Sequence, residues 1–126
     1  MEDGDFEQMY GTVKVCGEIL NGKKDGAWVE NHPNTDVPRF IIHYKEDKKN
    51  GLFLEFDKQS NLIKKIEYKN DKIDGWNYSW NRGGKIVWKQ EYKDGQLDGV
   101  SVLYTDKGFI QEESDYKAGK RDGVTT

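Results

Sequence analysis

The segment Tyr92-Lys93-Asp94-Gly95-Gln96-Leu97-Asp98-Gly99 contains the pattern that decides the fold of this chain. It opens with tyrosine and lysine, closes with an Asp-Gly or Asn-Gly pair, and recurs at intervals of 24 residues. The other copies are Tyr44–Gly51, Tyr68–Gly75 and Tyr116–Gly123, with a degenerate copy at Ile19–Gly26 that is offset by 25 residues. Self-similarity at a fixed period of this length is typical of a repeat protein.

Each repeat continues with an aromatic residue, a turn and then an aliphatic residue. The aromatics are Phe56, Trp80 and Tyr104, the turns end at Ser60, Gly84 and Gly108, and the aliphatics are Leu62, Ile86 and Ile110. This order predicts two short strands and two turns per repeat, such as residues 85–92 and 96–105. We therefore expect an all-β fold: an elongated antiparallel hairpin meander of about five 24-residue repeats in a single twisted sheet.

The repeats fill a single domain over residues 1–126. The predicted units are 4–25, 26–50, 51–74, 75–98 and 99–122, with a C-terminal stub at 123–126. Residues 1–18 match the pattern poorly, and we expect them to form a capping strand, because terminal repeats are usually atypical. The core is expected to be thin, since Leu, Ile, Val and Phe total 27 of 126 residues, and two alanines disfavour a helical fold.

The glycine at the third place of Lys93-Asp94-Gly95 suits a three-residue hairpin loop. Such loops would pair residue 68 with 72, residue 78 with 88, and residue 80 with 86. Even-numbered side chains would then share one aromatic face, and odd-numbered side chains would share one charged face. The repeated tyrosines would form a ladder on alternate strands. The Asp74-Gly75 and Asp98-Gly99 pairs are the expected places for a bend in the sheet.

This pattern of tyrosine, lysine, an Asp-Gly corner, an aromatic residue and a glycine turn resembles the MORN repeat family. It is most similar to bacterial MORN-variant repeats, which include the YwqK-type antitoxins. The resemblance covers residues 19–123, and it departs at Asp47 and Asp71, which stand where glycine is usual. It implies an elongated β-meander that serves as a binding platform and needs no cofactor.

Two groups of residues are candidates for contact with a partner protein. Trp76, Tyr78, Trp80 and Trp88 are concentrated in one unit, and Trp and Tyr dominate interface energetics. The alternative is that these rings form the core of a thin sheet. The second group is His32, Asn34 and Arg39, in the segment 31–39 that contains both prolines and interrupts the second unit. Irregular loops on a rigid repeat often carry function, although this one also fits a tolerated insertion.

Other kinds of site find little support. The only histidines, His32 and His43, lie eleven residues apart without a cysteine pair, and the single cysteine, Cys16, is expected to be a small buried residue. We expect no catalytic residues, no metal and no cofactor. The net charge of −3 argues against nucleic acid, and the interleaved lysines argue against membrane contact. An acidic N-terminus without an apolar segment suggests a cytoplasmic protein.

The sequence therefore favours a non-enzymatic protein-binding module of bacterial, antitoxin or immunity-like character, which masks a partner protein by occlusion. The alternative hypothesis is a structural or assembly module that homodimerises or tethers complexes at a membrane.

Overall fold

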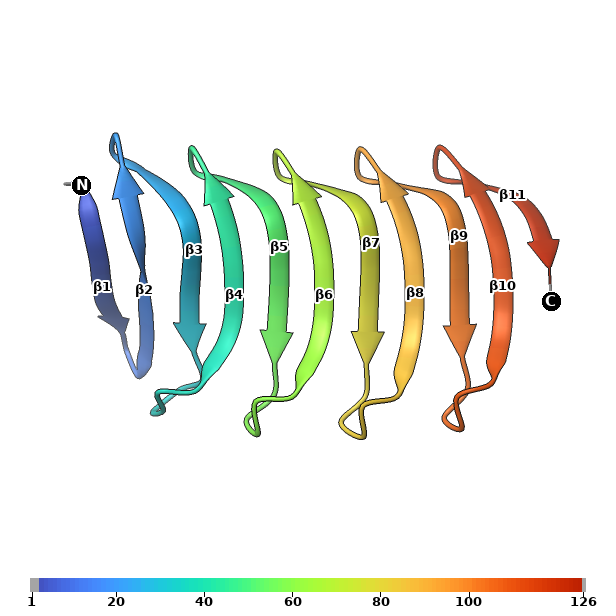
Figure 1. The fold of residues 1–126 in the computed structure, drawn as a ribbon, viewed down its shortest axis with the longest axis horizontal. Helices are drawn as coiled ribbons and strands as arrows, with labels where there is room; N and C mark the ends of the chain where they lie inside the picture. Colours follow the sequence, from blue (N-terminus) through green and yellow to red (C-terminus); the bar gives the residue numbers. More distant parts are fainter. Residues whose placement is uncertain (1–2, 126) are drawn as a thin grey trace.

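The computed structural model describes residues 3–125, which form a single open sheet of eleven antiparallel strands (Figure 1). Their bounds are β1 (Gly4–Tyr10), β2 (Val13–Leu20), β3 (Lys23–Asn31), β4 (Pro38–Lys45), β5 (Lys48–Phe56), β6 (Leu62–Lys69), β7 (Lys72–Trp80), β8 (Ile86–Lys93), β9 (Gln96–Tyr104), β10 (Ile110–Lys117) and β11 (Lys120–Thr125). The spatial order equals the chain order, so the predicted all-β hairpin meander is confirmed. The described residues contain no helix that is long and apolar enough to cross a membrane.

The N-terminal segment belongs to the sheet. Within residues 1–18, β1 is an edge strand that pairs with β2 from Gly4–Ile19 to Tyr10–Val13. Residues 1–2 and 126 of the expected domain lie outside the described residues. In the part of the chain that the structure describes, the segment supplies β1 and most of β2, and β1 pairs with β2 alone.

The turns along the upper edge of Figure 1 differ from the prediction, because they contain two residues rather than three. Lys93 pairs with Gln96, and the two residues between them, Asp94 and Gly95, have φ of 49° and 84°. Positive φ at both central positions defines a type I′ turn, whose twist matches that of the flanking strands. The expected three-residue loop is therefore wrong.

Two differences of one residue each reverse the faces of every second strand: the two-residue upper turns, and a register shift beside the lower loops, such as that between Ser79 and Trp80. Tyr68 pairs with Ile73 rather than residue 72, and Tyr78 pairs with Lys89 rather than Trp88. The pairing of Trp80 with Ile86 is confirmed. Consequently the predicted division into one aromatic face and one charged face is wrong, and both faces mix the two kinds of side chain.

Residues that pair directly across neighbouring strands have their side chains on the same face of the sheet. We therefore define two faces, A and B, each by one row of such partners. The row on face A is Phe6, Gly17, then Trp28, Ile42, Phe53, Ile66, Asn77, Gln90, Ser101 and Ser114. The row on face B is Cys16, Val29, Ile41, Leu54, Lys65, Tyr78, Lys89, Val102 and Glu113. The tyrosine ladder lies on face A, on strands β4, β6, β8 and β10, as its repeat spacing predicts.

The bends occur at the predicted Asp-Gly corners. The strand register shifts where Asp74-Gly75 and Trp76 of β7 lie opposite the single residue Glu67 of β6. Gly75 has φ of 115°, a conformation that side chains other than glycine rarely adopt. The Glu67 carboxylate occupies the space that a Cβ would need there, and its Oε2 accepts a hydrogen bond from the Trp76 N–H at 2.8 Å. The Asp98-Gly99 corner repeats this arrangement with Glu91, so both corners depend on a glycine and on the carboxylate of the neighbouring strand.

The lower loops that follow β5, β7 and β9 share one hydrogen-bond pattern. The N–H of Asp57 donates to the carbonyl of Asn61, and the N–H of Asn81 donates to that of Lys85, four residues later in each case. In the segment 31–39, the His32 N–H donates instead to the Val37 carbonyl, five residues later. This loop is the same turn with one extra residue, which accounts for the 25-residue offset of the degenerate copy.

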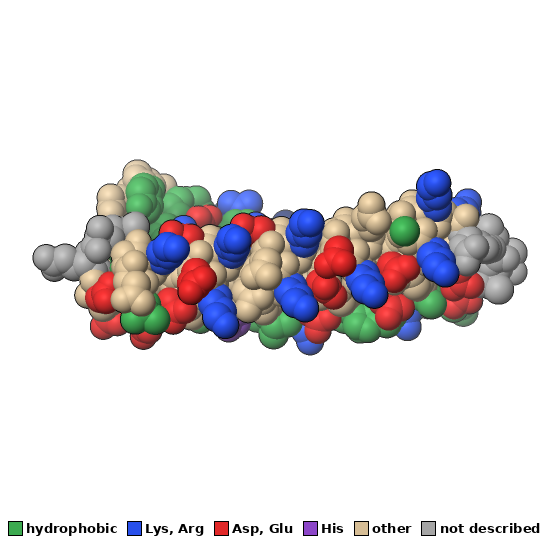
Figure 2. Space-filling model, turned by 90° about the horizontal axis from the view of Figure 1, so that it is seen from above, with side chains coloured by type: hydrophobic (Ala, Val, Ile, Leu, Met, Phe, Trp, Pro, Cys, Tyr) green, Lys and Arg blue, Asp and Glu red, His purple; other side chains and the backbone are tan. Residues whose placement is uncertain are grey.

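Consecutive units are also joined at the upper turns. The Asp47 N–H donates to the Lys24 carbonyl, while the Asp47 carboxylate accepts from the Lys24 N–H at 2.7 Å. Asp71 and Lys49 repeat both bonds one unit further on. Asp47 and Asp71 stand where the later repeats have Gly95 and Gly119, and they therefore add a hydrogen bond at each of their turns. Along much of this edge, lysines and carboxylates interleave (Figure 2).

Candidate functional site

An aromatic column stands on face B near the middle of the sheet. Trp76, Tyr78 and Trp80 project from β7, with ring centroids 5.7 and 5.6 Å apart and interplanar angles of 20° and 21°. All three rings are half-buried. Because the described residues form a single sheet, this face has no second layer over it. The three predicted residues are thus brought together, with their faces turned toward one another.

Two lysines flank the column. Lys65 of β6 and Lys89 of β8 are the cross-strand partners of Tyr78, and Lys89 Nζ lies 6.0 Å from the Trp76 ring centroid. Neither ammonium has a carboxylate within ion-pair distance among the described side chains. The Glu67 and Glu91 carboxylates of the same strands are turned to the corner backbone of Trp76 and Val100. The column therefore lies between two unpaired positive charges.

Trp88 does not join this column. It pairs with Ser79, whose side chain alternates with Tyr78, so Trp88 lies on face A. Its indole Nε1 is buried, and no group of the described residues accepts a hydrogen bond from it. The predicted contact between Tyr78 and Trp88 is wrong, because the strand register shifts by one residue between Ser79 and Trp80, next to the confirmed pairing of Trp80 with Ile86.

The loop candidates separate into two places. His32 and Arg39 line a hollow of about 590 Å³ near the lower loops, together with Phe56, Asp57 and Arg82. His32 is buried, and its Nε2 donates to the Phe56 carbonyl at 2.9 Å. Asn34 lies elsewhere, where its N–H donates to the Thr12 carbonyl at 2.9 Å. His32 is therefore a structural residue of the loop. Arg39 and Arg82 are the cationic residues that line the hollow.

Asp57 organises the loop below this hollow and gives a pH-dependent prediction. Its Oδ1 accepts the N–H groups of Asn61 and Gln59, each at 2.9 Å. The Asn61 bond is the main cause that holds the pKa of Asp57 below its usual value, and Arg82 adds to it. A lowered folded-state pKa stabilises the fold above the unfolded pKa of about 4, and this stabilisation is lost as pH falls below it.

We expect Asp57→Ala to lower the urea midpoint at pH 7, because two backbone donors lose their acceptor. Asp57→Asn should retain the turn, since Asn81 accepts the same two bonds from Gly83 and Lys85 one repeat later. The asparagine variant should also lose less stability than the wild type between pH 5 and about pH 3. Urea titrations at several pH values test this, and equal acid sensitivity of both proteins would refute it.

The described side chains form no arrangement for metal binding or for histidine-based chemistry. Among the described residues, no three His, Cys, Asp or Glu side chains gather in a way that could hold a metal ion. His43 Nδ1 donates to the Leu52 carbonyl at 3.0 Å, so both histidines are used in backbone hydrogen bonds. Cys16 is a free, half-buried thiol on face B.

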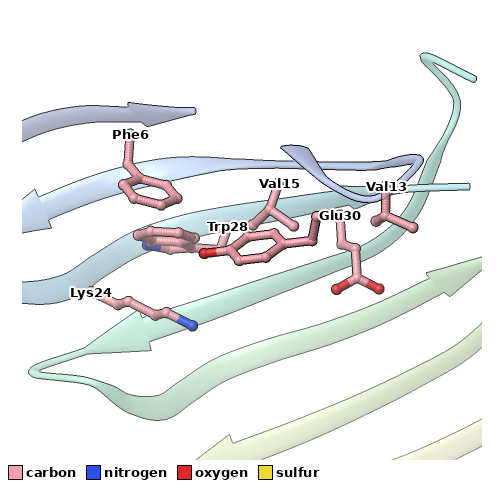
Figure 3. A pocket seen from close by; sticks show the side chains of 7 residues that line it. Phe6, Val13, Val15, Lys24, Trp28 and Glu30 are labelled. Atoms are coloured by element: carbon pink, nitrogen blue, oxygen red, sulfur yellow. The ribbon is translucent and has the colours of Figure 1, made fainter. Parts of the chain in front are cut away.

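A second hollow, of about 400 Å³, lies on face A over β1, β2 and β3 (Figure 3). Its lining residues are Phe6, Tyr10, Val13, Val15, Lys24, Trp28 and Glu30. Trp28 lies against Gly17, where a Cβ would collide with the indole. Phe6 lies 5.2 Å from the Trp28 ring, and Lys24 Nζ lies 5.0 Å from it. The spacing of residues in the sequence did not indicate this hollow. It is formed by residues of three strands, and Gly17 leaves the space that the Trp28 ring occupies.

No protein-family model and no curated protein matches this chain.

Proposed function

We propose that this chain is a non-enzymatic protein-binding module that masks a partner protein by occluding part of its surface. The observation that carries the proposal is the aromatic column of Trp76, Tyr78 and Trp80 on a sheet face without a covering layer. Tryptophan and tyrosine at the centre of a patch supply most of the energy of protein interfaces. Strand β7, near the middle of the sheet, carries the column. The rigid sheet therefore fixes the geometry of the three rings before a partner binds.

The charges around the column indicate the chemistry of the partner. Lys65 and Lys89 lie on either side of Tyr78 without carboxylate partners. An apolar groove bordered by Asp or Glu side chains would complement this pattern, with the ion pairs at the rim setting specificity. We therefore propose an acidic partner surface.

The geometry favours a protein over a stacking ligand. A nucleobase or a sugar ring needs an open aromatic face. In the column, Tyr78 has a ring on each side at 5.6 and 5.7 Å, so its faces are occupied and the ring edges point outward. A groove that packs around such a ridge is a common arrangement in protein interfaces.

The biological setting follows from the resemblance to the MORN-variant repeats. The four copies of the Tyr-Lys pattern support an antitoxin or immunity-like role of a bacterial protein, in which binding neutralises the partner. The single cysteine suits a reducing compartment such as the cytoplasm.

The test is a pull-down from the source cells with the tagged chain, followed by mass spectrometry. We expect one stoichiometric protein, with retention at least tenfold lower for the double variant Trp76→Ala/Tyr78→Ala. Trp88→Ala is the matched control, because it removes a tryptophan of the neighbouring strand from the opposite face. The chain should also suppress the activity of the purified partner.

Two outcomes would contradict the proposal. Equal retention by the wild type and the column variant would remove the column from the interface. A stable homodimer that shields Trp76 and retains no other protein would instead support the alternative, a structural or assembly module.

A further inference from the structure

The outer edge of β1 offers backbone hydrogen-bonding groups that no described strand uses. In residues 3–125, β1 pairs only with β2. This pairing runs through seven consecutive residue pairs without a register shift, whereas each of the other nine strand pairings contains one. A regular edge strand without a bulge or proline is a template on which another extended segment can pair.

The same end of the molecule concentrates negative charge. Residues 3–20 contain four carboxylates and one lysine, while residues 21–126 contain 19 basic and 18 acidic side chains. Asp5 and Glu7 are exposed and lie on face B, because Glu7 pairs with Cys16. Lys14 bonds Glu7 at 2.9 Å but leaves Asp5 without a cation within ion-pair distance among the described side chains. A segment that pairs with this edge would meet an excess of negative charge on face B.

On face A the same strand carries two aromatic side chains, Phe6 and Tyr10, on either side of Gln8. Phe6 and Tyr10 line the hollow together with Trp28, and Tyr10 remains 55% exposed. Glu30, another lining residue of the hollow, also lacks a cation within ion-pair distance among the described side chains. Apolar side chains of an added strand would therefore find aromatic neighbours on this face.

A second copy of the chain fits this edge poorly. Two β1 strands related by a two-fold axis would bring the Asp5 and Glu7 carboxylates of both copies together, and like charges in opposed strands repel. Placing β11 of one copy beside β1 of the next by translation would create a parallel pair, because both strands run in the same direction in an antiparallel sheet of eleven. Every pairing in this sheet is antiparallel.

We propose that the outer edge of β1 binds an extended segment of a partner protein in which basic residues alternate with apolar ones. The basic side chains lie beside Asp5 and Glu7 on face B, and the apolar side chains lie beside Phe6 and Tyr10 on face A. Main-chain hydrogen bonds supply affinity and the alternating side chains supply specificity. This inference rests on the proposed function only in assigning the segment to a partner protein, because its site is separate from the aromatic column.

The test uses a capped nine-residue peptide that alternates lysine and valine, titrated into the full chain and followed by amide NMR. We expect shifts confined to β1 and β2, and slower hydrogen exchange at alternate β1 amides. Asp5→Lys/Glu7→Lys should weaken binding at least tenfold, and the neutral variant Asp5→Asn/Glu7→Gln should weaken it less. Asp106→Lys/Asp115→Lys is the matched control at the other end of the sheet, where both carboxylates are also exposed, and it should bind as the wild type does.

Several results would overturn the inference. One is the absence of binding at millimolar peptide, and another is equal affinity for a peptide whose lysines are grouped together. The others are NMR shifts centred on β7 and slow hydrogen exchange of every β1 amide in the free protein. Failure of the peptide while Trp76→Ala/Tyr78→Ala still releases the cellular partner would refute the edge site alone. Binding of the peptide with no effect of the column variant on that partner would refute the proposed function alone.

Discussion

Replacing Trp28 with alanine is expected to lower the free energy of unfolding by about 3–5 kcal/mol, the usual cost of removing a buried aromatic side chain. Trp28 is 4% exposed and is one of three buried apolar side chains among the described residues, with Ile19 and Val102. Its ring contacts Phe6 at 5.2 Å and Tyr44 at 6.3 Å between centroids. The substitution also removes the donor that Nε1 provides to the Glu18 carbonyl at 3.1 Å.

The loss should be concentrated at the N-terminal end, because a repeat sheet is stabilised by contacts between neighbouring units. Urea unfolding followed by circular dichroism gives the total effect, and amide hydrogen exchange locates it. We expect faster exchange in β1–β3 and little change in β9 and β10. Trp80→Ala, at a half-buried ring of face B, is the control and should cost less than half as much. A Trp28→Ala protein within 1 kcal/mol of the wild type would show that the ring is not part of the core.

Gly75→Ala is the second substitution with a large expected effect, a loss of about 3 kcal/mol. A side chain at φ of 115° adds backbone strain of about 1–3 kcal/mol. The new Cβ would also occupy the position of the Glu67 carboxylate, which then could not accept the Trp76 N–H. A lost hydrogen bond to a charged group costs a further 1.5–3 kcal/mol or so.

Gly84→Ala separates these two causes. Gly84 also has positive φ, at 81°, but no atom lies within 4 Å of its ideal Cβ. It should therefore cost only about 1–2 kcal/mol, from backbone strain alone. In Gly75→Ala/Glu67→Ala the overlap is already absent, so the two single effects should add to more than the double effect. Equal urea midpoints for Gly75→Ala and Gly84→Ala would contradict the role assigned to the Glu67 carboxylate.

The architecture could be predicted from the sequence because its signals are local and repeated. Tyr44, Tyr68, Tyr92 and Tyr116, each followed by an Asp-Gly or Asn-Gly corner, determine the number and order of the strands. The corner glycines also marked the bends correctly, since a left-handed backbone position in a strand favours glycine. Neither signal requires knowledge of how strands pair.

The facing of side chains could not be predicted, because it depends on the length of the upper turns and on a one-residue register shift beside the lower loops. Lys93-Asp94-Gly95 suits a three-residue loop, and Asp94-Gly95 alone equally suits a type I′ turn. The copy at Glu46-Asp47 lacks glycine and gives no further indication, although its φ values of 52° and 65° define the same turn. Trp88 was assigned to the wrong face for the second reason, the register shift between Ser79 and Trp80.

The candidate site was predicted in part for the same reason. Spacing by two along one strand correctly grouped Trp76, Tyr78 and Trp80, whichever turn precedes them. Lys65 and Lys89 were missed for two reasons. The place of Lys65 beside Tyr78 requires the two-residue upper turn, and that of Lys89 requires the register shift between Ser79 and Trp80. A hairpin built with a type I′ turn would have placed Lys65 on the face of Tyr78 from the sequence, but not Lys89.

The even period of 24 residues and the bonds between successive upper turns have a consequence for how such a chain changes by gene duplication. A unit copied in tandem would add one hairpin, keep every side chain on its original face and extend the sheet by about 10 Å, or two strand spacings. The Asp47–Lys24 and Asp71–Lys49 junctions show that one bonding scheme serves successive junctions, so an added unit requires no new kind of interface. Length can therefore vary in evolution independently of the residues that contact a partner.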